Sequence, residues 1–516
     1  MHASDTQKHQ LDEETFLSIR SPDWLVAAVF ATCFLALFLL RSQVSDLQGD
    51  ETWTRLLVRL PLSESWSFLV RDGKHPPLFP MVTRALGLLL PDRPSALRVV
   101  SLLAASSMPP SVYLFARRWA APRWPSAAIA IWVGMHPLVS LHAVNARPYA
   151  LLTFLVMLHA ALIADFLLLH KPKSLWASGA VASAAVITHA FGVLFVLSST
   201  FIAMMWVVAR RQKGEPVPVA AMARSQAPAL GLCIAWFAFV QFSLRHSTGI
   251  SAGLDWVEFP TTFERFFGFV TLLGSADFPR STTLTAAVWL LVVACVVGLR
   301  KRPSSQLVLI ALTFVCIFAP FIAQNLVSGL IAKMPLWGNR HVLPTVGLLA
   351  IGSVIAIRDS KSSRLATAVF VAFAALAVGS LSTVSLWRRT AMSDIAGAYD
   401  VLPRGMEIRV AYEYGDLNVL NYYLSVDCLD DYQFRVQFPD LKGPADPSVR
   451  GPQCIAKPFG VRTGAGGPLL MVYRSFVPRE VGLRDSVAAS GWRSSGRHDF
   501  VTEKIVAEFF LPPTKP

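Results

Sequence analysis

Charged side chains are scarce in this sequence of 516 residues. Asp, Glu, Lys and Arg together make up 16% of it, whereas a soluble chain carries about 25%. The acids are the minority among them, with 33 acidic residues against 47 basic ones. Hydrophobic residues fill 53% of the chain. This composition excludes an ordinary soluble globular protein and predicts that the chain lies in a membrane.

Uncharged apolar runs divide the sequence into about eleven expected membrane spans, since a helix needs roughly 20 apolar residues to cross a bilayer. Residues 174–209 would form a helix about 54 Å long, too long for one crossing, so we expect two helices with a hinge at 188-THAFG-192. The expected spans are 24–40, 99–116, 125–144, 148–169, 174–188, 190–209, 226–243, 282–299, 305–326, 342–357 and 365–386.

Basic residues gather in alternate connections between these spans, which is the positive-inside pattern. We therefore expect those connections and the N-terminal tail in the cytoplasm, and the C-terminus outside. The net charge of +14 then sets the orientation and gives no support for a nucleic-acid partner. The basic residues are Arg117, Arg118 and Arg123; Lys171 and Lys173; Arg210, Arg211, Lys213 and Arg224; Arg300, Lys301 and Arg302; and Arg358, Lys361 and Arg364.

The tail has a different character, because Gly, Pro and charged residues return. The runs 406-MEIRVAYEY-414, 432-YQFRVQF-438 and 468-PLLMVYRSF-476 are typical of strands, and 393–401 and 416–424 suit short helices. We expect a polytopic α-helical domain over residues 1–387 and a small α/β domain over 388–516. Cysteine is rare, with six residues, and Cys428 and Cys454 are the two in the tail. An oxidising compartment would let them form a disulfide; the alternative is two free thiols.

The first outer loop, residues 41–98, contains more than a connector needs. Its beginning, 45-SDLQGDETWT-54, places Asp46, Asp50 and Glu51 directly after the first span. Apolar residues at helical spacing follow. The run 78-LFPMVTRALGLLL-90 is too short to cross and suits a helix along the outer interface. These helices could merely cap the bundle, or they could hold the acids at a membrane-level site.

Basic residues also mark the outer starts of several helices. A helix N-terminus presents free N–H groups and about half a positive charge, and proline suits the first helical position. Together with basic side chains, such helix starts favour binding of an anion, above all a phosphate. For any one of these residues, the alternative is a side chain that extends to the interface. The residues are Lys74 and His75 in 73-GKHPPL-78, Arg98, Arg147, His189, Arg340 and His341.

Five motifs resemble those of GT-C glycosyltransferases, in the bacterial branch related to protein O-mannosyltransferases and the lipid A aminoarabinose transferase. They are 49-GDETW-53, 74-KHPPLF-79, 145-NARPYALL-152, 188-THAFGVLFVL-197 and 338-GNRHVLPTVGLL-349, and the resemblance covers roughly residues 20–390. It implies a multi-pass protein of the bacterial cytoplasmic (inner) membrane with its active site on the periplasmic side. It also implies a polyprenyl-phosphate-linked sugar as donor and a lipid, glycan or protein as acceptor.

The resemblance places the catalytic acid in the pair Asp50–Glu51, and the residue that contacts the lipid phosphate at Lys74 or His75. The residues suggest the same chemistry. Asp50 would act as general base on the acceptor hydroxyl, and Glu51 would orient Asp50 or the acceptor. The leaving phosphate needs fixed cations, which Lys74, His75, Arg147, Arg340 and His341 would supply. Further candidates for substrate binding are Arg98, Tyr149, His189 and Asp255, although His189 suits a hydrogen-bonded hinge residue equally well.

Adjacent carboxylates diverge, whereas retaining chemistry needs two about 5 Å apart, so we expect inversion of the sugar. Asp46, Asp50, Glu51 and Asp255 are hard oxygen ligands that would suit a divalent metal, but no spacing among them requires one. No cofactor is therefore expected. The rival classes are a transporter, a flippase for lipid-linked sugars and a non-catalytic assembly protein. A transporter should carry charges in mid-span and often repeats its halves, whereas here the candidate residues gather on one face.

Overall fold

The computed structural model describes most of the helical part of the chain and a smaller part of the tail. The described residues are 20–44, 51, 54–55, 57–58, 60–72, 76–90, 94–212, 219–246, 339–359, 363–383, 409–411, 469–474, 484–485, 487–489, 491–500 and 505–511. The chain divides into two compact units. One comprises Met1–Leu40, Ser67–Leu86 and Arg98–Ser385, and the other Arg41–Trp66, Gly87–Leu97 and Leu386–Pro516. The expected boundary between residues 387 and 388 stays a prediction.

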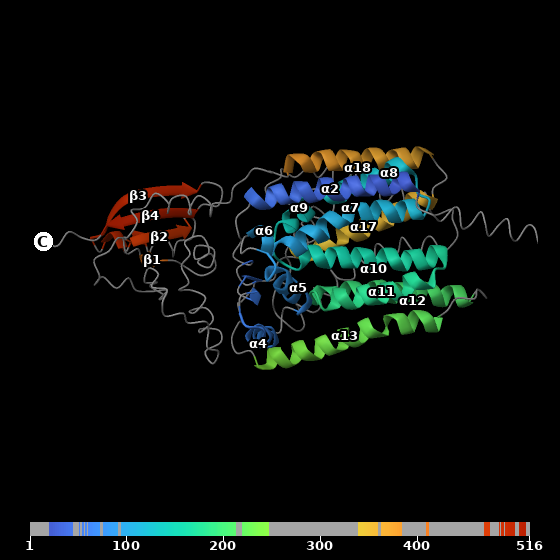
Figure 1. The fold of residues 1–516 in the computed structure, drawn as a ribbon, viewed down its shortest axis with the longest axis horizontal. Coiled ribbons are helices and arrows are strands. Elements are labelled where there is room, and N and C mark those ends of the chain that lie inside the picture. The colour runs from blue at the N-terminus through green and yellow to red at the C-terminus, as the bar shows by residue number, and fades with distance from the viewer. Residues whose placement is uncertain are drawn as a thin grey trace, which may run out of the picture. The chain divides into compact units, whose positions relative to one another are not determined.

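The first unit is a bundle of long apolar helices (Figure 1). Every expected span within the described residues is helical, because lipid offers no partner for backbone N–H and C=O groups and a helix pairs them internally. The spans 282–299 and 305–326 lie outside the described residues. The helices are α2 (Ser21–Val44), α7 (Val99–Arg118), α8 (Arg123–Met135), α9 (Pro137–Ala143), α10 (Tyr149–Leu169), α11 (Pro172–Val186), α12 (Ala190–Gln212), α13 (Val219–His246), α17 (Asn339–Asp359) and α18 (Ser363–Thr383).

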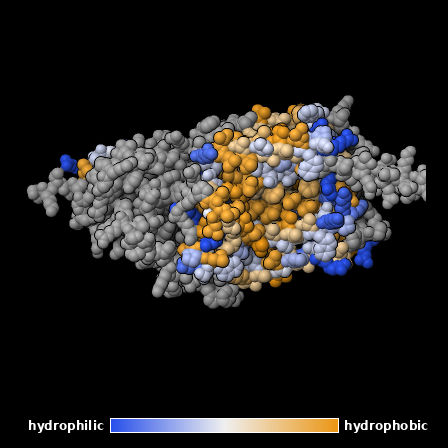
Figure 2. All heavy atoms as spheres, viewed as in Figure 1, coloured by the Kyte–Doolittle hydropathy of each residue, from blue (hydrophilic) through white to orange (hydrophobic). Residues whose placement is uncertain are grey.

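Length and apolar composition make this chain a multi-pass membrane protein. Among the described residues, Ser21–Gln43, Val99–Arg118 and Tyr149–Leu169 are each long and apolar enough to cross a membrane, and the bent pair α8–α9 adds a fourth span if counted as one. Figure 2 shows apolar side chains covering the middle of the helices, with hydrophilic side chains concentrated at the right-hand ends in this view. An apolar band of this kind matches the hydrocarbon core of a bilayer.

Two breaks interrupt the expected spans. The hinge between α11 and α12 is confirmed, since α11 ends at Val186 and α12 begins at Ala190. The expected span 125–144 differs from the expectation, because α8 and α9 meet at a 53° bend. His136 lies at this bend as the N-cap of α9, and its Nδ1 accepts a hydrogen bond from the Leu138 backbone N at 3.3 Å. The cause is Pro137, which disfavours the helical conformation at the residue before it.

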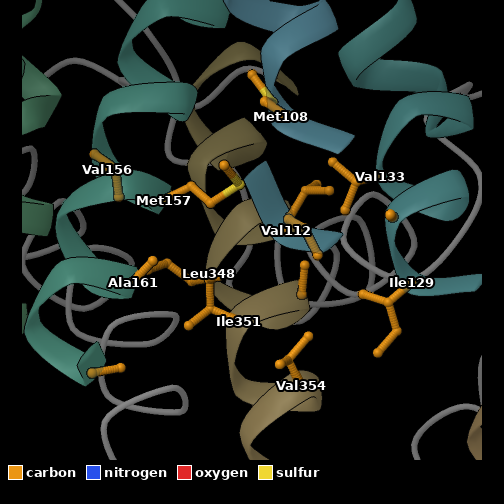
Figure 3. Close-up of a cluster of buried hydrophobic side chains, with 14 of the residues drawn as sticks. Met108, Val112, Ile129, Val133, Val156, Met157, Ala161, Leu348, Ile351 and Val354 are labelled. Atoms are coloured by element: carbon orange, nitrogen blue, oxygen red, sulfur yellow. The ribbon is translucent and has the colours of Figure 1, made fainter. Parts of the chain in front are cut away.

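The core of the bundle is formed where α7, α8, α10 and α17 meet (Figure 3). Met108 and Val112 of α7 and Val133 of α8 are fully buried among aliphatic side chains. Gly347 of α17 permits a close approach to α10, since a Cβ there would lie 2.7 Å from the Cβ of Met157. In Figure 3, the chain runs downward from Met157 to Ala161 in α10, and it also runs downward from Leu348 to Val354 in α17. The two helices α10 and α17 therefore run parallel.

One end of the bundle is held together by the buried carboxylate of Asp23, in the first turn of α2. Its Oδ1 accepts hydrogen bonds from Tyr113 Oη at 2.9 Å, from Arg117 Nε at 3.2 Å and from Arg123 Nη2 at 3.1 Å. Hydrogen bonds to ionised groups are stronger than neutral ones. The start of α2 therefore lies at the same end as the connection between α7 and α8.

A second carboxylate, Asp165 near the end of α10, joins the same end to α11. It accepts hydrogen bonds from Arg118 Nε at 2.7 Å and Nη2 at 2.9 Å, from Trp119 Nε1 at 3.1 Å, and from the Ser174 hydroxyl. The bidentate guanidinium contact fixes both groups geometrically. The connection 119–122, which Arg117, Arg118 and Arg123 flank, and the connection 170–171 consequently share one end of the bundle, as the positive-inside pattern predicts.

A buried polar network crosses the interior of α10–α13. His159 Nε2 lies 2.9 Å from Ser199 Oγ, and His159 Nδ1 lies 3.1 Å from the backbone oxygen of Ser178. Gln226 Nε2 donates to Ser178 Oγ at 3.2 Å. Each of the four residues belongs to a different helix, so the network fixes the register of the four helices against one another. Such interhelical hydrogen bonds contribute about 0.6 kcal/mol each on average.

The first loop contains short helices, and the tail contains a sheet. In the loop region α4 spans Leu62–Asp72, α5 spans Leu78–Gly87 and α6 spans Pro94–Leu97. The expected helix over 78–90 is thus confirmed over α5, and its location along the outer interface stays a prediction. The described strands β1 (Arg409–Ala411), β2 (Leu469–Arg474), β3 (Arg493–Phe500) and β4 (Ile505–Leu511) form a sheet of order β1-β2-β4-β3. Strand β1 is parallel to β2, whereas β2 and β3 are antiparallel to β4.

The tail matches the expected strands in part. The runs 406–414 and 468–476 contain β1 and β2, whereas the run 432–438 and the expected helices 393–401 and 416–424 lie outside the described residues. Strand β4 was not expected, although Val506, Glu508 and Phe510 alternate toward its buried face. The charge of Glu508 is matched by Arg484, whose Nε and Nη2 donate to it at 3.0 Å each.

Candidate functional site

The start of α7 and the turn before α10 meet in the interior of the bundle. Arg98 is the N-cap residue of α7 and is fully buried, and one turn later Ser101 Oγ donates to the backbone oxygen of Arg147 at 3.1 Å. The Arg147 backbone N donates to the backbone oxygen of Asn145 at 2.7 Å, which closes a tight turn. Pro148 then serves as the N-cap of α10. Two expected site residues, Arg98 and Arg147, are thus placed at neighbouring helix starts.

Both arginine side chains lie inside the protein, since Arg98 is 0% and Arg147 is 8% exposed. Buried cations interact with an anion far more strongly than exposed ones, because the interior screens charge less than water does. The N-terminus of α10 adds its own partial positive charge. Two buried guanidinium groups at neighbouring helix starts are an arrangement that suits an anion such as phosphate.

A row of aromatic and imidazole rings follows the turn. The ring centroid of Tyr149 lies 5.1 Å from that of His142 and 5.3 Å from that of His189, and the His189 ring stacks on Phe191 at 5.4 Å. Tyr149, His142 and His189 are all buried. The expected candidates Tyr149 and His189 are therefore in contact with each other, across the start of α10 and the hinge between α11 and α12.

His189 also has the structural role that was its alternative interpretation. Its Nδ1 accepts a hydrogen bond from the Phe191 backbone N at 3.1 Å, which satisfies a donor at the start of α12. The hinge also contacts α5: the backbone N of Leu78, the first residue of α5, donates to the backbone oxygen of Ile187 at 2.9 Å. The hinge thus connects α5 to the start of α12, with the His189 ring against Tyr149.

The first turn of α17 begins at the same end of the bundle. Helices α10 and α17 run parallel, and both begin roughly two turns before the contact between Met157 and Gly347. Arg340 and His341 are helical residues of that first turn. Their side chains lie outside the described part of the chain. The backbone alone places these two expected phosphate ligands at the level of Tyr149.

Of the expected acid pair, the structure describes Glu51, and several other expected site residues lie outside the described part of the chain. Glu51 is helical and fully buried. Its assigned role of orienting the base stays a prediction. The residues outside the described part are Asp50, Lys74, His75, Asp255, Cys428 and Cys454.

Some residues near the expected ones were not anticipated as site residues. His142 contacts Tyr149, Asn145 accepts the hydrogen bond of the turn, and Ser101 joins the two helix starts. The motif 145-NARPYALL-152 contained Asn145, but nothing in the sequence links Ser101 to residue 147. Within the described ranges, no group of three or more His, Cys, Asp or Glu side chains could hold a metal ion.

Comparison with known proteins identifies the fold. No family model matches the chain, and no curated protein matches it. Solved structures do match it, among them two of ArnT from Cupriavidus metallidurans, one in the apo state and one bound to undecaprenyl phosphate. The apo structure has a TM-score of 0.52 and 14% identity, over 94% of this chain and 97% of ArnT. The second has a TM-score of 0.52 and 15% identity, over 95% and 98%. ArnT is the lipid A aminoarabinose transferase, a GT-C glycosyltransferase, so this chain has the GT-C fold that its five motifs predicted.

Proposed function

We propose that this protein is a membrane glycosyltransferase that moves a sugar from a polyprenyl-phosphate carrier to an acceptor hydroxyl. The acceptor is a lipid, a glycan or a protein, and the reaction takes place on the periplasmic side of the bacterial inner membrane. The GT-C fold supports the reaction class, and the ArnT structure with bound undecaprenyl phosphate supports a carrier of the same chemical type.

The single observation that carries the proposal is the buried positive layer at one end of the bundle. Arg98 and Arg147 are buried at neighbouring helix starts, and Arg340 and His341 occupy the first turn of the parallel helix α17. A polyprenyl phosphate has its charge at the end of a long apolar chain, so its phosphate must be held where the protein meets the edge of the hydrocarbon core. A cationic layer at helix starts suits that requirement.

Lys74, His75, Arg147, Arg340 and His341 would hold the phosphate, and Tyr149, His189, Arg98 and Asp255 would contact the sugar or the acceptor. The Tyr149 ring is held between the imidazoles of His142 and His189, and an aromatic ring is a side chain of the kind that packs against a sugar. A phenol with two ring neighbours has little rotamer freedom to lose on binding. Tyr149 is therefore the best-positioned of these residues for contact with the sugar.

In the reaction, Asp50 removes the proton of the acceptor hydroxyl as its oxygen attacks the anomeric carbon. The bond between that carbon and the phosphate oxygen breaks, and the electron pair leaves on the phosphate. The cationic layer stabilises the charge that develops there. One displacement inverts the anomeric configuration, and the products are the glycosylated acceptor and a free polyprenyl phosphate. Glu51 orients Asp50 or the acceptor.

The test is a transfer assay with purified protein in vesicles that contain a polyprenyl phosphate carrying a labelled sugar. Mass spectrometry of envelope lipids and glycans, with and without the gene, first identifies the sugar and the acceptor. The proposal predicts that label moves from the carrier to the acceptor and that free polyprenyl phosphate appears in equal amount. A flippase would instead move the intact labelled carrier to the other leaflet without cleavage, and that result would refute the proposal.

A further inference from the structure

The ion cluster at the start of α2 has more positive than negative charge. One carboxylate, Asp23, accepts hydrogen bonds from the two guanidinium groups of Arg117 and Arg123. The carboxylate is buried, with 3% of its side chain exposed, whereas 21% of Arg117 and 45% of Arg123 are exposed. The cluster therefore presents a net positive charge at the surface, and the compensating acid lies beneath it.

Two exposed tryptophans accompany this cluster. Trp24 follows Asp23 in α2 and is 54% exposed, and Trp124 follows Arg123 in α8 and is 72% exposed. Tryptophan prefers the headgroup level of a bilayer, where its ring contacts apolar carbon and its N–H can bond to polar groups. Both tryptophans stand at the helix ends that the Asp23 hydrogen bonds bring together, so this surface lies at headgroup depth.

We propose that Arg117, Arg123, Trp24 and Trp124 form a docking site for the headgroup of an anionic phospholipid. The exposed edges of the guanidinium groups bind the lipid phosphate, since a planar guanidinium matches phosphate geometry. The tryptophans lie beside the glycerol and the first acyl carbons. Asp23 holds both arginines in place from below and keeps the site from carrying the full repulsion of two adjacent cations. This site is at the opposite end of α7 from Arg98, so it is separate from the proposed catalytic layer.

The experiment measures lipid retention by the detergent-solubilised full-length protein. Native mass spectrometry gives the apparent affinity for phosphatidylglycerol in competition with phosphatidylcholine. Arg123→Gln should lower the phosphatidylglycerol affinity about fivefold, the effect expected for one basic residue at an anionic surface. Trp124→Ala leaves the hydrogen bonds to Asp23 in place and should also lower retention of the lipid. The matched control is Lys173→Gln, which removes one exposed positive charge from the same end of the bundle and should change little.

Equal losses for Arg123→Gln and Lys173→Gln would overturn the proposal, because they would mean that general positive charge attracts the lipid. Equal retention of phosphatidylglycerol and phosphatidylcholine by the wild-type protein would also overturn it. Thermal unfolding in phosphatidylcholine alone shows whether Arg123→Gln is folded. If that variant is unfolded, Trp124→Ala alone decides, and unchanged retention in it refutes the site.

Discussion

Arg147 is the residue on which donor recognition most depends in this account. Its backbone oxygen accepts a hydrogen bond from Ser101 and its backbone N–H closes the turn with Asn145, so the backbone of Arg147 is fixed at both peptide groups. Hydrogen bonds to charged groups contribute about 1.5–3 kcal/mol. Arg147→Gln should therefore weaken binding of the polyprenyl-phosphate donor roughly 10- to 100-fold, as measured by titration of the reconstituted protein with the donor.

The control for this variant is Arg224→Gln. Arg224 is an exposed residue of α13 whose Nε donates to the backbone oxygen of Ala220 within its own helix. The substitution removes the same charge without touching the cationic layer, so donor affinity should be unchanged. If Arg147→Gln bound the donor as well as Arg224→Gln does, Arg147 would not be a phosphate ligand.

Basic candidates at helix starts were easier to select from the sequence than the residues that lie against them. Arg98, Arg147 and His189 were identifiable because a basic residue beside an apolar run is conspicuous. His142 was not, because residues 125–144 have the composition of one continuous span. The bend at His136 moves α9 away from the axis of α8 and brings His142 against Tyr149. Pro137 was the available signal, since it disfavours a helical conformation at the preceding residue.

At the level of helices, packing in the bundle depends on small residues at close approaches. A Cβ on Gly179 of α11 would lie 1.9 Å from the backbone oxygen of Ser225 in α13. A backbone atom cannot turn aside as a flexible side chain can, so Gly179→Ala must push the two helices apart. We expect a loss of about 1–3 kcal/mol of stability, the usual cost of overpacking, measured as a lower midpoint of thermal unfolding in detergent.

Gly231→Ala in α13 provides the comparison, because a Cβ there meets nothing within 4 Å. Alanine favours a helix over glycine by about 1 kcal/mol, so this variant should be as stable as the wild type or more stable. The two substitutions are chemically identical and differ only in what the new methyl group meets. Equal midpoints for Gly179→Ala and Gly231→Ala would contradict the close packing of α11 on α13.

For the elements of the tail, the prediction concerns the cysteine pair, which lies outside the described residues. A disulfide between Cys428 and Cys454 would contribute about 2–4 kcal/mol of stability. Its loss in Cys454→Ser should lower the unfolding midpoint of the tail and leave sugar transfer intact. Thiol capping followed by non-reducing electrophoresis measures the bond. Rapid reaction of both thiols with a membrane-impermeant reagent in the native protein would rule it out.

Helices were predictable where apolar runs are long, and strands were less so. The expected spans coincide with α2, α7 and α10–α13 because lipid requires an internally paired backbone. Strand β3, with the sequence Arg493–Phe500, could not be recognised from alternation. Its residues Arg493–Arg497 are all exposed, so this described part of the strand buries no alternating apolar face. Strand β4 has a buried acid in its apolar pattern, Glu508, which obscured it in the same way.

For the whole molecule, the structure shows which segments lie at the same end of the helix bundle, and it leaves open which side of the membrane that end faces. The hydrogen bonds of Asp23 and Asp165 bring the start of α2, the connection 119–122 and the start of α11 to one end. Labelling of one accessible residue at this end therefore shows on which side of the membrane all three segments lie. In a cysteine-free background, Lys173→Cys should react with a membrane-impermeant label only after the cells are opened, since that end is expected in the cytoplasm.

Leu62→Cys, in the first loop, should behave in the opposite way and react in intact cells. Leu62 is 59% exposed, so the thiol would be accessible to the reagent. Labelling of Lys173→Cys from outside intact cells would reverse the orientation of the whole bundle. It would also place the cationic layer on the cytoplasmic side, opposite to the side that the proposed function requires.

The central claim is that this molecule transfers a sugar with a carboxylate placed where the chain leaves its first span. Asp50→Asn keeps the size and shape of the side chain but removes its ability to accept a proton. General-base catalysis contributes roughly 10²- to 10⁴-fold, so turnover should fall at least about a hundredfold while donor binding survives. Asp485→Asn, an exposed substitution in the tail, is the control.

The decisive measurement is transfer of labelled sugar from polyprenyl phosphate by wild type, Asp50→Asn and Asp485→Asn in reconstituted vesicles, with donor affinity measured in parallel. We expect sugar transfer by the wild type and by Asp485→Asn. In Asp50→Asn we expect the transfer rate to fall at least about a hundredfold while the donor affinity is unchanged. An inserted, folded Asp50→Asn protein that transfers sugar as fast as the wild type would contradict it.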